Sequence, residues 1–349
     1  MSSRNFHLAA EHDGLTLAAA LKRLLADQSW SQVRKVIASR RVQVNGNLCL
    51  DEERHVGSGD VVKLLDHALA PPVNATDVRL VYVDEHLVVV QKPAGVTTLR
   101  HREETDLPQR RKQLQPTLDE LVQHQLAHHL GIALHDTSPQ RKRGARLPEP
   151  RRSRKPAPDK RLRIRPVHRL DRDTSGLMVF ARTPEAEQKL IRMFAKHEVQ
   201  RAYVAVVHGR VEAQTIDTWF VRDRGDGLRG STPLGEPAEG AQRAITHLRP
   251  MEQLTNYTII ECRLETGRTH QIRIHLSEIG HPICGEKLYT HLPGQPPQDD
   301  TSGAPRQALH SAELAFIHPT TGQPLRFRMP LPHELKDWLL RLRQKGANP

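Results

Sequence analysis

The feature of this sequence that most constrains its fold is a polar segment, residues 165–176, which runs directly into the apolar residues 177–181. The apolar part predicts a buried strand, and Gly176 predicts a turn before it. Asp171 should therefore lie at a sheet edge, where the arginines at positions 165, 169 and 172 would keep its carboxylate charged. Such a carboxylate can be a nucleophile, a general base, a metal ligand or a salt-bridge partner. Considered alone, the segment favours the salt bridge.

The composition indicates a polar protein with room for two or three domains. Hydrophobic residues make up 37% of its 349 positions, and no run approaches the roughly 18 apolar residues of a membrane span. The N-terminus lacks the apolar region of a signal peptide, so we expect a cytoplasmic protein with no membrane partner. Cys49, Cys262 and Cys284 lie far apart, which argues against a disulfide framework or a zinc cluster and favours plain core residues.

The charge of the chain points to a polyanionic partner. Its formal net charge is +12, which favours nucleic acid over membrane because no basic amphipathic helix with a broad apolar face stands out. Residues 100–165 hold 17 Lys/Arg and 8 Asp/Glu, a surplus of +9. This segment could be a solvated basic insertion, a phosphate-binding arm, or both. Within it, residues 138–160 should be disordered without RNA.

The first 65 residues predict two helices and a small sheet. Leucines at helical spacing predict a helix over 15–30, and Ser31 is a suitable N-cap for a second helix. Asn45-Gly46 predicts a hairpin, and a turn at Gly59-Asp60 precedes another strand. The second helix would bury Val33, Val36 and Ile37. Its outward, basic face comprises Arg34, Lys35, Arg40 and Arg41.

This segment resembles the alpha-L RNA-binding module first known from a ribosomal small-subunit protein. The resemblance rests on residues 31–37, 41–46 and 57–62. It implies that the four basic residues of the second helix meet RNA; a small structural domain with an ordinary charged helix is the alternative. The predicted organisation is an RNA-binding domain over 1–66, a linker over 67–79 and a catalytic domain over 80–349 with a basic insertion at about 100–163.

Strands over 80–83 and 87–90 open the second domain, and the Lys92–Gly95 segment after them is best interpreted as a turn. A helix over 117–130 carries His124 and His128 at the spacing of two metal ligands. The residue after His124 is Gln125, however, so the zinc-protease pattern fails and ordinary histidines are favoured. Further along, we expect a helix over 183–197, strands over 203–207 and 257–264, two short strands around residues 319–322, and a last helix over 334–343.

A second polar segment, residues 265–276, predicts a strand end, a turn, Thr269 as a helix N-cap and a helix to about residue 279. Arg268, His270 and Arg273 would gather at the start of this helix, which forms a natural anion site. Strands in runs with few crossover helices indicate an α+β domain with a mixed, mainly antiparallel sheet.

The sequence lacks a glycine-rich phosphate loop, a Gly-x-Ser-x-Gly elbow, a Cys-His pair and a carboxylate cluster for catalytic metals. Asp171, the arginines and Tyr203 then suggest chemistry on RNA without a cofactor or metal.

The chain from about residue 80 to 332 resembles pseudouridine synthases of the His-Arg-Leu-Asp branch, which modify large-subunit ribosomal RNA and transfer RNA. Five blocks match in order, at residues 83–95, 168–176, 201–205, 266–273 and 308–322. The resemblance implies a pseudouridine-synthase catalytic domain, preceded here by the small α/β RNA-binding domain, that acts on a flipped-out uridine. Two positions depart from the family pattern: Arg201 replaces a lysine, and Glu286 replaces an aspartate.

The resemblance also implies roles for individual residues. Asp171 would be the nucleophile, or the base that starts a glycal route, and Arg273 would pair with it. Tyr203 would stack on the uracil and take the proton from carbon 5, directly or through water. Arg169 would hold the position vacated by the base, with His168, Arg268 and His270 also contacting RNA.

Large-subunit rRNA or its precursor particle is the expected target, since the N-terminal module usually accompanies enzymes of that class, and a monomer is expected. The alternatives are a transfer-RNA pseudouridine synthase, a non-catalytic RNA-binding ribosome-assembly factor and a metal-dependent nuclease.

Overall fold

The computed structural model describes residues 3–45, 47–68, 73–100, 116–133, 159–232, 238–292, 295–296 and 298–347. The chain divides into two compact units, with the boundary between residues 72 and 73. The expected disorder of residues 138–160 falls almost entirely outside the described residues. None of the described helices is both long enough and apolar enough to cross a bilayer.

The first unit is a small α/β domain. Its antiparallel sheet has the strand order β1-β4-β2-β3, and the two helices pack against each other and on the sheet. The strands and helices are β1 (Ser3–His7), α1 (Leu17–Leu24), α2 (Trp30–Ala38), β2 (Val42–Val44), β3 (Asn47–Leu48) and β4 (Val61–Leu65), with a 3-10 turn at Ala10–His12. Strand β1, which the sequence did not predict, pairs with β4 along its whole length.

The helix boundaries of this unit correct the sequence prediction. Ser29, not Ser31, caps α2: its hydroxyl accepts the amide N–H of Gln32, and the Gln32 side chain accepts the Ser29 amide N–H. This reciprocal capping box satisfies two otherwise free amides, which decides where the helix begins. Val33 and Ile37 of α2 are buried as expected, whereas Val36 is only partly buried.

The second unit is built on one large mixed sheet. Among the described residues its main path runs β11-β10-β12-β13-β9-β14-β8-β6-β5, with β15 paired to β14 and β7 paired to β8. Of the strand pairs in the described residues, only β14–β8 is parallel. The strands are β5 (Arg79–Val83), β6 (Leu87–Lys92), β7 (Arg165–Pro166), β8 (Ser175–Ala181), β9 (Gln200–His208), β10 (Gln214–Val221), β11 (Gly230–Ser231), β12 (Gln242–Gln253), β13 (Tyr257–Leu264), β14 (Leu309–Ile317) and β15 (Pro324–Arg328). The mixed, mainly antiparallel α+β fold is confirmed.

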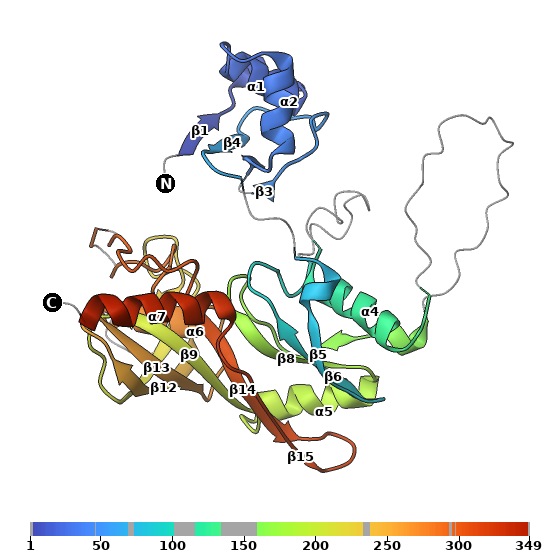
Figure 1. Cartoon of the computed structure of the whole chain (residues 1–349), viewed down its shortest axis with the longest axis vertical. Coiled ribbons are helices and arrows are strands. Elements are labelled where there is room, and N and C mark those ends of the chain that lie inside the picture. The colour runs from blue at the N-terminus through green and yellow to red at the C-terminus, as the bar shows by residue number, and fades with distance from the viewer. Residues whose placement is uncertain are drawn as a thin grey trace, which may run out of the picture. The chain divides into compact units, whose positions relative to one another are not determined.

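The helices of this unit within the described residues are α4 (Leu118–His129), α5 (Pro184–Ala195), α6 (Gln271–Glu278) and α7 (His333–Ala347), with 3-10 turns at Ala75–Asp77 and Lys160–Leu162. In Figure 1, α4 and α5 accompany the β5–β6–β8 half of the sheet, while α6 and α7 accompany the β9–β12–β13 half. Leu118 of α4 shares a core with Val88 and Val90, but Leu190 of α5 shares a core with Val89. Because successive strand residues face opposite ways, α4 and α5 cover opposite faces of the sheet.

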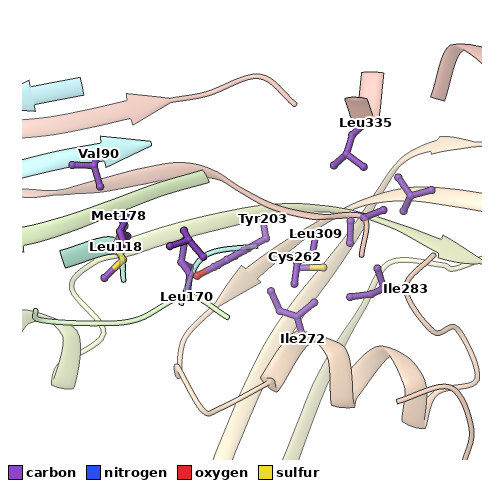
Figure 2. Packing of buried hydrophobic residues seen from close by; sticks show 14 of the residues in the cluster. Val90, Leu118, Leu170, Met178, Tyr203, Cys262, Ile272, Ile283, Leu309 and Leu335 are labelled. Atoms are coloured by element: carbon purple, nitrogen blue, oxygen red, sulfur yellow. The ribbon is translucent and has the colours of Figure 1, made fainter. Parts of the chain in front are cut away.

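The main core runs along the centre of the sheet. Figure 2 shows Met178 of β8, Tyr203 of β9 and Cys262 of β13 in the same cluster as Ile272 of α6 and Leu335 of α7. Cys49, Cys262 and Cys284 are all buried and free, as predicted. The Tyr203 ring belongs at once to this core and to the cleft beside it. The site is therefore supported from behind by well-packed strands.

Candidate active site

The loop that carries Asp171 is held on both sides, by the last residue of β6 and by a residue of the segment that follows this strand. The Lys92 ammonium, completely buried, donates to the carbonyls of Arg172 (2.9 Å), Thr174 (2.8 Å) and Pro93 (3.2 Å). On the other side of Asp171, the Thr98 hydroxyl donates to the Leu170 carbonyl at 2.7 Å. These bonds order the backbone around the carboxylate. The Lys92–Gly95 segment is thus a turn, as predicted, and its lysine supports the loop.

Gly176 allows the next strand to approach β14 closely. Its φ of +120° is unfavourable for other residues, and a Cβ placed there would lie 2.2 Å from the Ser311 carbonyl oxygen. This contact occurs where β8 and β14 form their parallel pair. The sequence prediction of a turn at Gly176 is wrong: the turn lies at residues 172–173, and Gly176 is the second residue of β8. Its glycine is needed because two backbones approach closely there, five residues after Asp171.

Arg273 of α6 links two carboxylates. Its Nη1 lies 3.4 Å from Asp171 Oδ2, while its Nε and Nη2 donate to the two oxygens of Glu286 at 2.8 and 2.7 Å. The Glu286 side chain is 2% exposed. Although burial acts against it, the bond to Arg273 holds the pKa of Glu286 below its usual range. The Arg273 guanidinium therefore lies between the two carboxylates, and its paired bonds to Glu286 fix the orientation of its plane.

His270 lies on the other side of Asp171, with its Nε2 3.8 Å from Oδ1. The Nδ1 atom lies 2.8 Å from the hydroxyl of the buried Tyr289. Burial lowers the pKa of His270 and raises the pKa of Tyr289 to about 12. Since a carboxylate only accepts, the neutral imidazole best presents its proton at Nε2 and accepts the Tyr289 hydroxyl at Nδ1. His270 has a φ of 60°, a strained conformation at the start of the helix.

Asp171, His270 and Arg273 line a cleft of about 470 Å³. Tyr203 and Leu309 form part of its wall, and Figure 2 shows the Tyr203 ring extending from β9 toward Leu170. Burial raises the pKa of Tyr203, so its phenol is protonated at neutral pH. Four of the residues predicted to contact RNA line the cleft: His168, Arg169, Arg268 and His270. Of these, Arg169 is exposed. The volume falls in the range of pockets that bind small molecules.

His168 and Arg201 shape one end of the cleft. The His168 ring stacks on Phe194 with centroids 4.6 Å apart, and its Nε2 accepts the Val179 amide N–H. Burial, aided by Arg201, lowers the pKa of His168 to about 3. Arg201 is 8% exposed and donates to the carbonyls of Glu265 and Thr266. It is therefore a buried cation whose hydrogen-bond partners are neutral.

The other predicted neighbours of Asp171 point elsewhere. Arg165 pairs with Glu187 at 3.1 Å, and Arg172 donates to the Gly95 carbonyl. The sequence predicted Thr269 as the N-cap of α6, and this prediction is wrong. The Gln271 side chain instead accepts the Arg268 amide N–H. The cation closest to Asp171 comes from 102 residues further along the chain.

The predicted RNA-binding residues of the first unit lie on and just after α2. Arg34 is 63% exposed and 3.3 Å from Glu52, and Lys35 is exposed. Arg40 has a φ of 62° in the turn after the helix. Arg41 is partly buried, and its Nε donates to the Leu65 carbonyl at 2.7 Å. This donor is therefore not free to bind a ligand.

The site residues predicted from the sequence did not include Lys92, Glu286 or Tyr289. In the sequence, Glu286 stood out only because it replaces an aspartate of the family pattern. That replacement, an acid for an acid, was the signal that could have identified it as a site residue. No group of three or more potential metal ligands occurs among the described residues. His124 and His128 are exposed on α4, as expected for ordinary histidines.

Comparison with known proteins identifies the family. The family model for RNA pseudouridylate synthase matches residues 86–278. The chain belongs to this family. A second model, the S4 domain, matches residues 16–62. The family expected from the sequence is thus confirmed, and the chain is an RNA pseudouridine synthase with an S4 RNA-binding domain.

Two curated relatives resemble nearly the whole chain. It is 32% identical to "Ribosomal large subunit pseudouridine synthase D" of Xylella fastidiosa, over 96% of this chain and 91% of the relative. It is also 32% identical to the protein of the same name from Vibrio parahaemolyticus, over 92% and 89%. Among solved structures, "Human RNA Pseudouridylate Synthase Domain Containing 4" has the same fold, with a TM-score of 0.53 and 21% identity over 76% of this chain and 92% of that one.

Proposed function

We propose that the chain converts specific uridines of large-subunit ribosomal RNA to pseudouridine, with Asp171 as the nucleophile. The observation that carries the proposal is the Asp171 carboxylate in a cleft of about 470 Å³, held by Arg273 and lined by Tyr203. The names of the two bacterial relatives and the S4 domain support the choice of ribosomal RNA.

The reaction replaces the bond between ribose C1′ and uracil N1 by a bond between C1′ and uracil C5. Asp171 attacks ribose C1′, and the bond from C1′ to uracil N1 breaks with its electron pair passing to the ring. The detached uracil turns within the cleft until C5 faces C1′. C5 then displaces the carboxylate, C5 loses its proton and N1 gains one. Atoms and charge balance, and the enzyme is regenerated.

Arg273 and His270 position the nucleophile in this proposal. Arg273 holds one oxygen of Asp171, and the Nε2 proton of His270 faces the other. Because Asp171 is 18% exposed and Arg273 12% exposed, solvent screens their attraction only in part. The carboxylate is thereby aimed at the sugar before the substrate binds, which lowers the cost of orientation.

Tyr203 provides the surface on which the uracil is held while it turns. An aromatic ring binds a base by stacking without dictating its rotation about the stacking axis. Because burial keeps the phenol protonated, we propose that it orients a water molecule that takes the C5 proton. This refines the role implied by the resemblance, in which the tyrosine could also act directly.

Arg169, His168 and Arg268 complete the nucleotide site. A uridine inside an RNA stack reaches the cleft only when it is flipped out. The planar guanidinium of Arg169, exposed at the cleft, can stack where the base was. Arg268 offers charge to the phosphate, and His168 keeps the wall of the cleft in place through Val179.

The first unit would anchor the ribosomal RNA. We propose that Arg34, Lys35, Arg40 and Arg41 contact phosphates, with the enzyme acting as a monomer in the cytoplasm. Replacing Arg34 and Lys35 together by alanine should weaken binding of rRNA and reduce its dependence on salt. Light scattering of the purified chain tests the monomer.

Mapping of pseudouridines in total RNA from cells with and without the gene tests the function. We expect specific sites in large-subunit rRNA to disappear and to return when the purified enzyme acts on rRNA from the deletion strain. Loss of sites only in transfer RNA would overturn the rRNA assignment. An unchanged map, with no product from purified enzyme, would overturn the function.

A further inference from the structure

A second cleft of about 270 Å³ lies next to the catalytic one, and the two share Arg268 and Thr269 as lining residues. It is formed where the end of β10, the turn before β11, the start of β12 and the turn before α6 converge. Its lining residues are Phe220, Val221, Arg222, Arg229, Gly240, Gln242, Arg268 and Thr269. A strand whose nucleotide occupied the catalytic cleft could therefore continue into this one.

The second cleft is strongly cationic. Among the described residues, its lining contains three arginines and no carboxylate. Arg222 and Arg229 are exposed, and within the described part of the chain neither has a hydrogen-bond or ion-pair partner. Arg268 donates through Nε to the Arg243 carbonyl at 2.9 Å, which fixes its position and still leaves its outer nitrogens as donors.

The two carboxylates that lie between Arg222 and Arg229 in the sequence are engaged elsewhere. Asp223 accepts the amide N–H groups of Gly225 and Gly227. Asp226 pairs with Arg224 at 2.9 Å and accepts the Leu228 amide N–H. The loop thus satisfies its own acidic groups internally. Among the described residues that line the cleft, no acidic side chain neutralises the arginines on either side of this loop.

We propose that this second cleft binds the phosphodiester groups of the RNA strand that flank the target uridine. The inference rests on the proposed function, since it takes RNA as the ligand and the catalytic cleft as the place of the flipped base. Arginine suits phosphate because its fork of donors matches two phosphate oxygens. Among the described lining residues the aromatic ring is that of Phe220, which is only 6% exposed and so offers little surface on which a second base could stack.

The subsite would act on binding and not on the chemical step. Arg222 and Arg229 lie outside the lining of the catalytic cleft. They would hold the strand in register, so that only the uridine at one distance from the bound phosphates enters the cleft. Phosphate contacts of this kind position the RNA without reading its sequence.

The test uses the full chain with Arg222→Ala and Arg229→Ala combined. The control is Lys336→Ala with Arg341→Ala, which removes the same charge from exposed positions of α7 that lack a side-chain partner in the described structure. Affinity for an in vitro transcript of large-subunit rRNA is measured by fluorescence anisotropy at several salt concentrations, and pseudouridine formation is measured separately.

We expect the double cleft variant to bind roughly 10-fold or more weakly at 0.15 M salt. The slope of log affinity against log salt should fall in magnitude by about 1.4 to 1.8, or 0.7 to 0.9 for each lost phosphate contact. KM should rise while the rate at saturating RNA stays within about twofold. The α7 control should keep the wild-type KM.

An unchanged salt slope in the cleft variant, or an equal loss in the control, would overturn the subsite. These outcomes are separate from failure of the proposed function, because anisotropy reports binding even if wild-type enzyme forms no pseudouridine.

Discussion

Arg273 is bound more tightly to Glu286 than to Asp171. Two hydrogen bonds of 2.8 and 2.7 Å join it to Glu286, whereas its nearest contact with Asp171 is 3.4 Å. Glu286 in turn accepts the amide N–H groups of Lys287 and Leu288, both at 2.9 Å. The position of Arg273, and through it the aim of Asp171, therefore depends on a second, buried carboxylate.

This relationship predicts that Glu286→Gln slows pseudouridine formation by on the order of 100-fold, because the guanidinium loses its fixed plane. Loss of a buried charge partner should also lower the free energy of unfolding by about 3 kcal/mol. Single-turnover rates and urea unfolding measure the two effects. Glu286→Asp keeps the charge and should restore most of the rate; equal rates for the glutamine variant and wild type would contradict the role.

Lys92 provides a second prediction. Replacement by methionine keeps the length of the side chain but leaves the carbonyls of Arg172 and Thr174 without their donor. We expect a loss of about 3 kcal/mol or more in unfolding free energy and a lower rate, since the Asp171 loop is no longer held. Lys189→Met is the control: it removes a single bond, to the exposed Pro319 carbonyl, and should change stability by less than about 0.5 kcal/mol.

Gly176 and Gly240 form a matched pair. Both have positive φ, but only at Gly176 would a Cβ meet backbone, whereas at Gly240 nothing lies within 4 Å. Gly240→Ala should cost about 1 kcal/mol, the penalty of the left-handed conformation. Gly176→Ala should cost several times more because β8 and β14 must separate. Thermal and urea unfolding measure both variants; similar costs would show that the β8–β14 approach is not tight in solution.

Two buried histidines predict an acid-sensitive fold. Burial lowers the pKa of His275 and of His310 to about 4, against 6.5 for an exposed imidazole. Between pH 6.5 and 4 the unfolded chain takes up protons that the folded chain does not, so stability falls as the pH falls. Each histidine contributes up to about 1.4 kcal/mol per pH unit.

Urea unfolding at several pH values checks this linkage. His275→Gln can retain bonds to Thr218 and Thr246 but does not titrate, so its stability should depend on pH less steeply, by about one proton. An identical pH dependence for the variant and wild type would show that His275 does not contribute.

Local patterns predicted those parts of the fold whose stabilising contacts are local. Strand β8 is a continuous apolar stretch, and helices α4 and α5 each have one apolar face. Hydrophobic periodicity detects both patterns. Strands β10 and β12 were missed. They are rich in Thr, Gln and Arg because much of their surface faces solvent, so the alternation is weak.

The site shows the same limit. Asp171, Tyr203 and Arg273 were proposed from motifs, and the structure places all three along one cleft. Arg165 was expected beside Asp171 because it is close in sequence, yet Glu187 on α5 takes it. Lys92 was missed as a support because its acceptors lie 80 and 82 residues away. Contacts of such separation leave no periodic trace in one sequence.

In the proposed mechanism, the Asp171 carboxylate attacks the sugar of a bound uridine. The decisive measurement is single-turnover pseudouridine formation by Asp171→Asn on large-subunit rRNA, with RNA affinity measured on the same preparation. Asparagine keeps the shape but removes the nucleophilic charge, so the rate should fall by on the order of 1,000-fold or more while affinity stays within a few-fold of wild type. A variant that folds, binds RNA and forms pseudouridine at the wild-type rate would contradict the account.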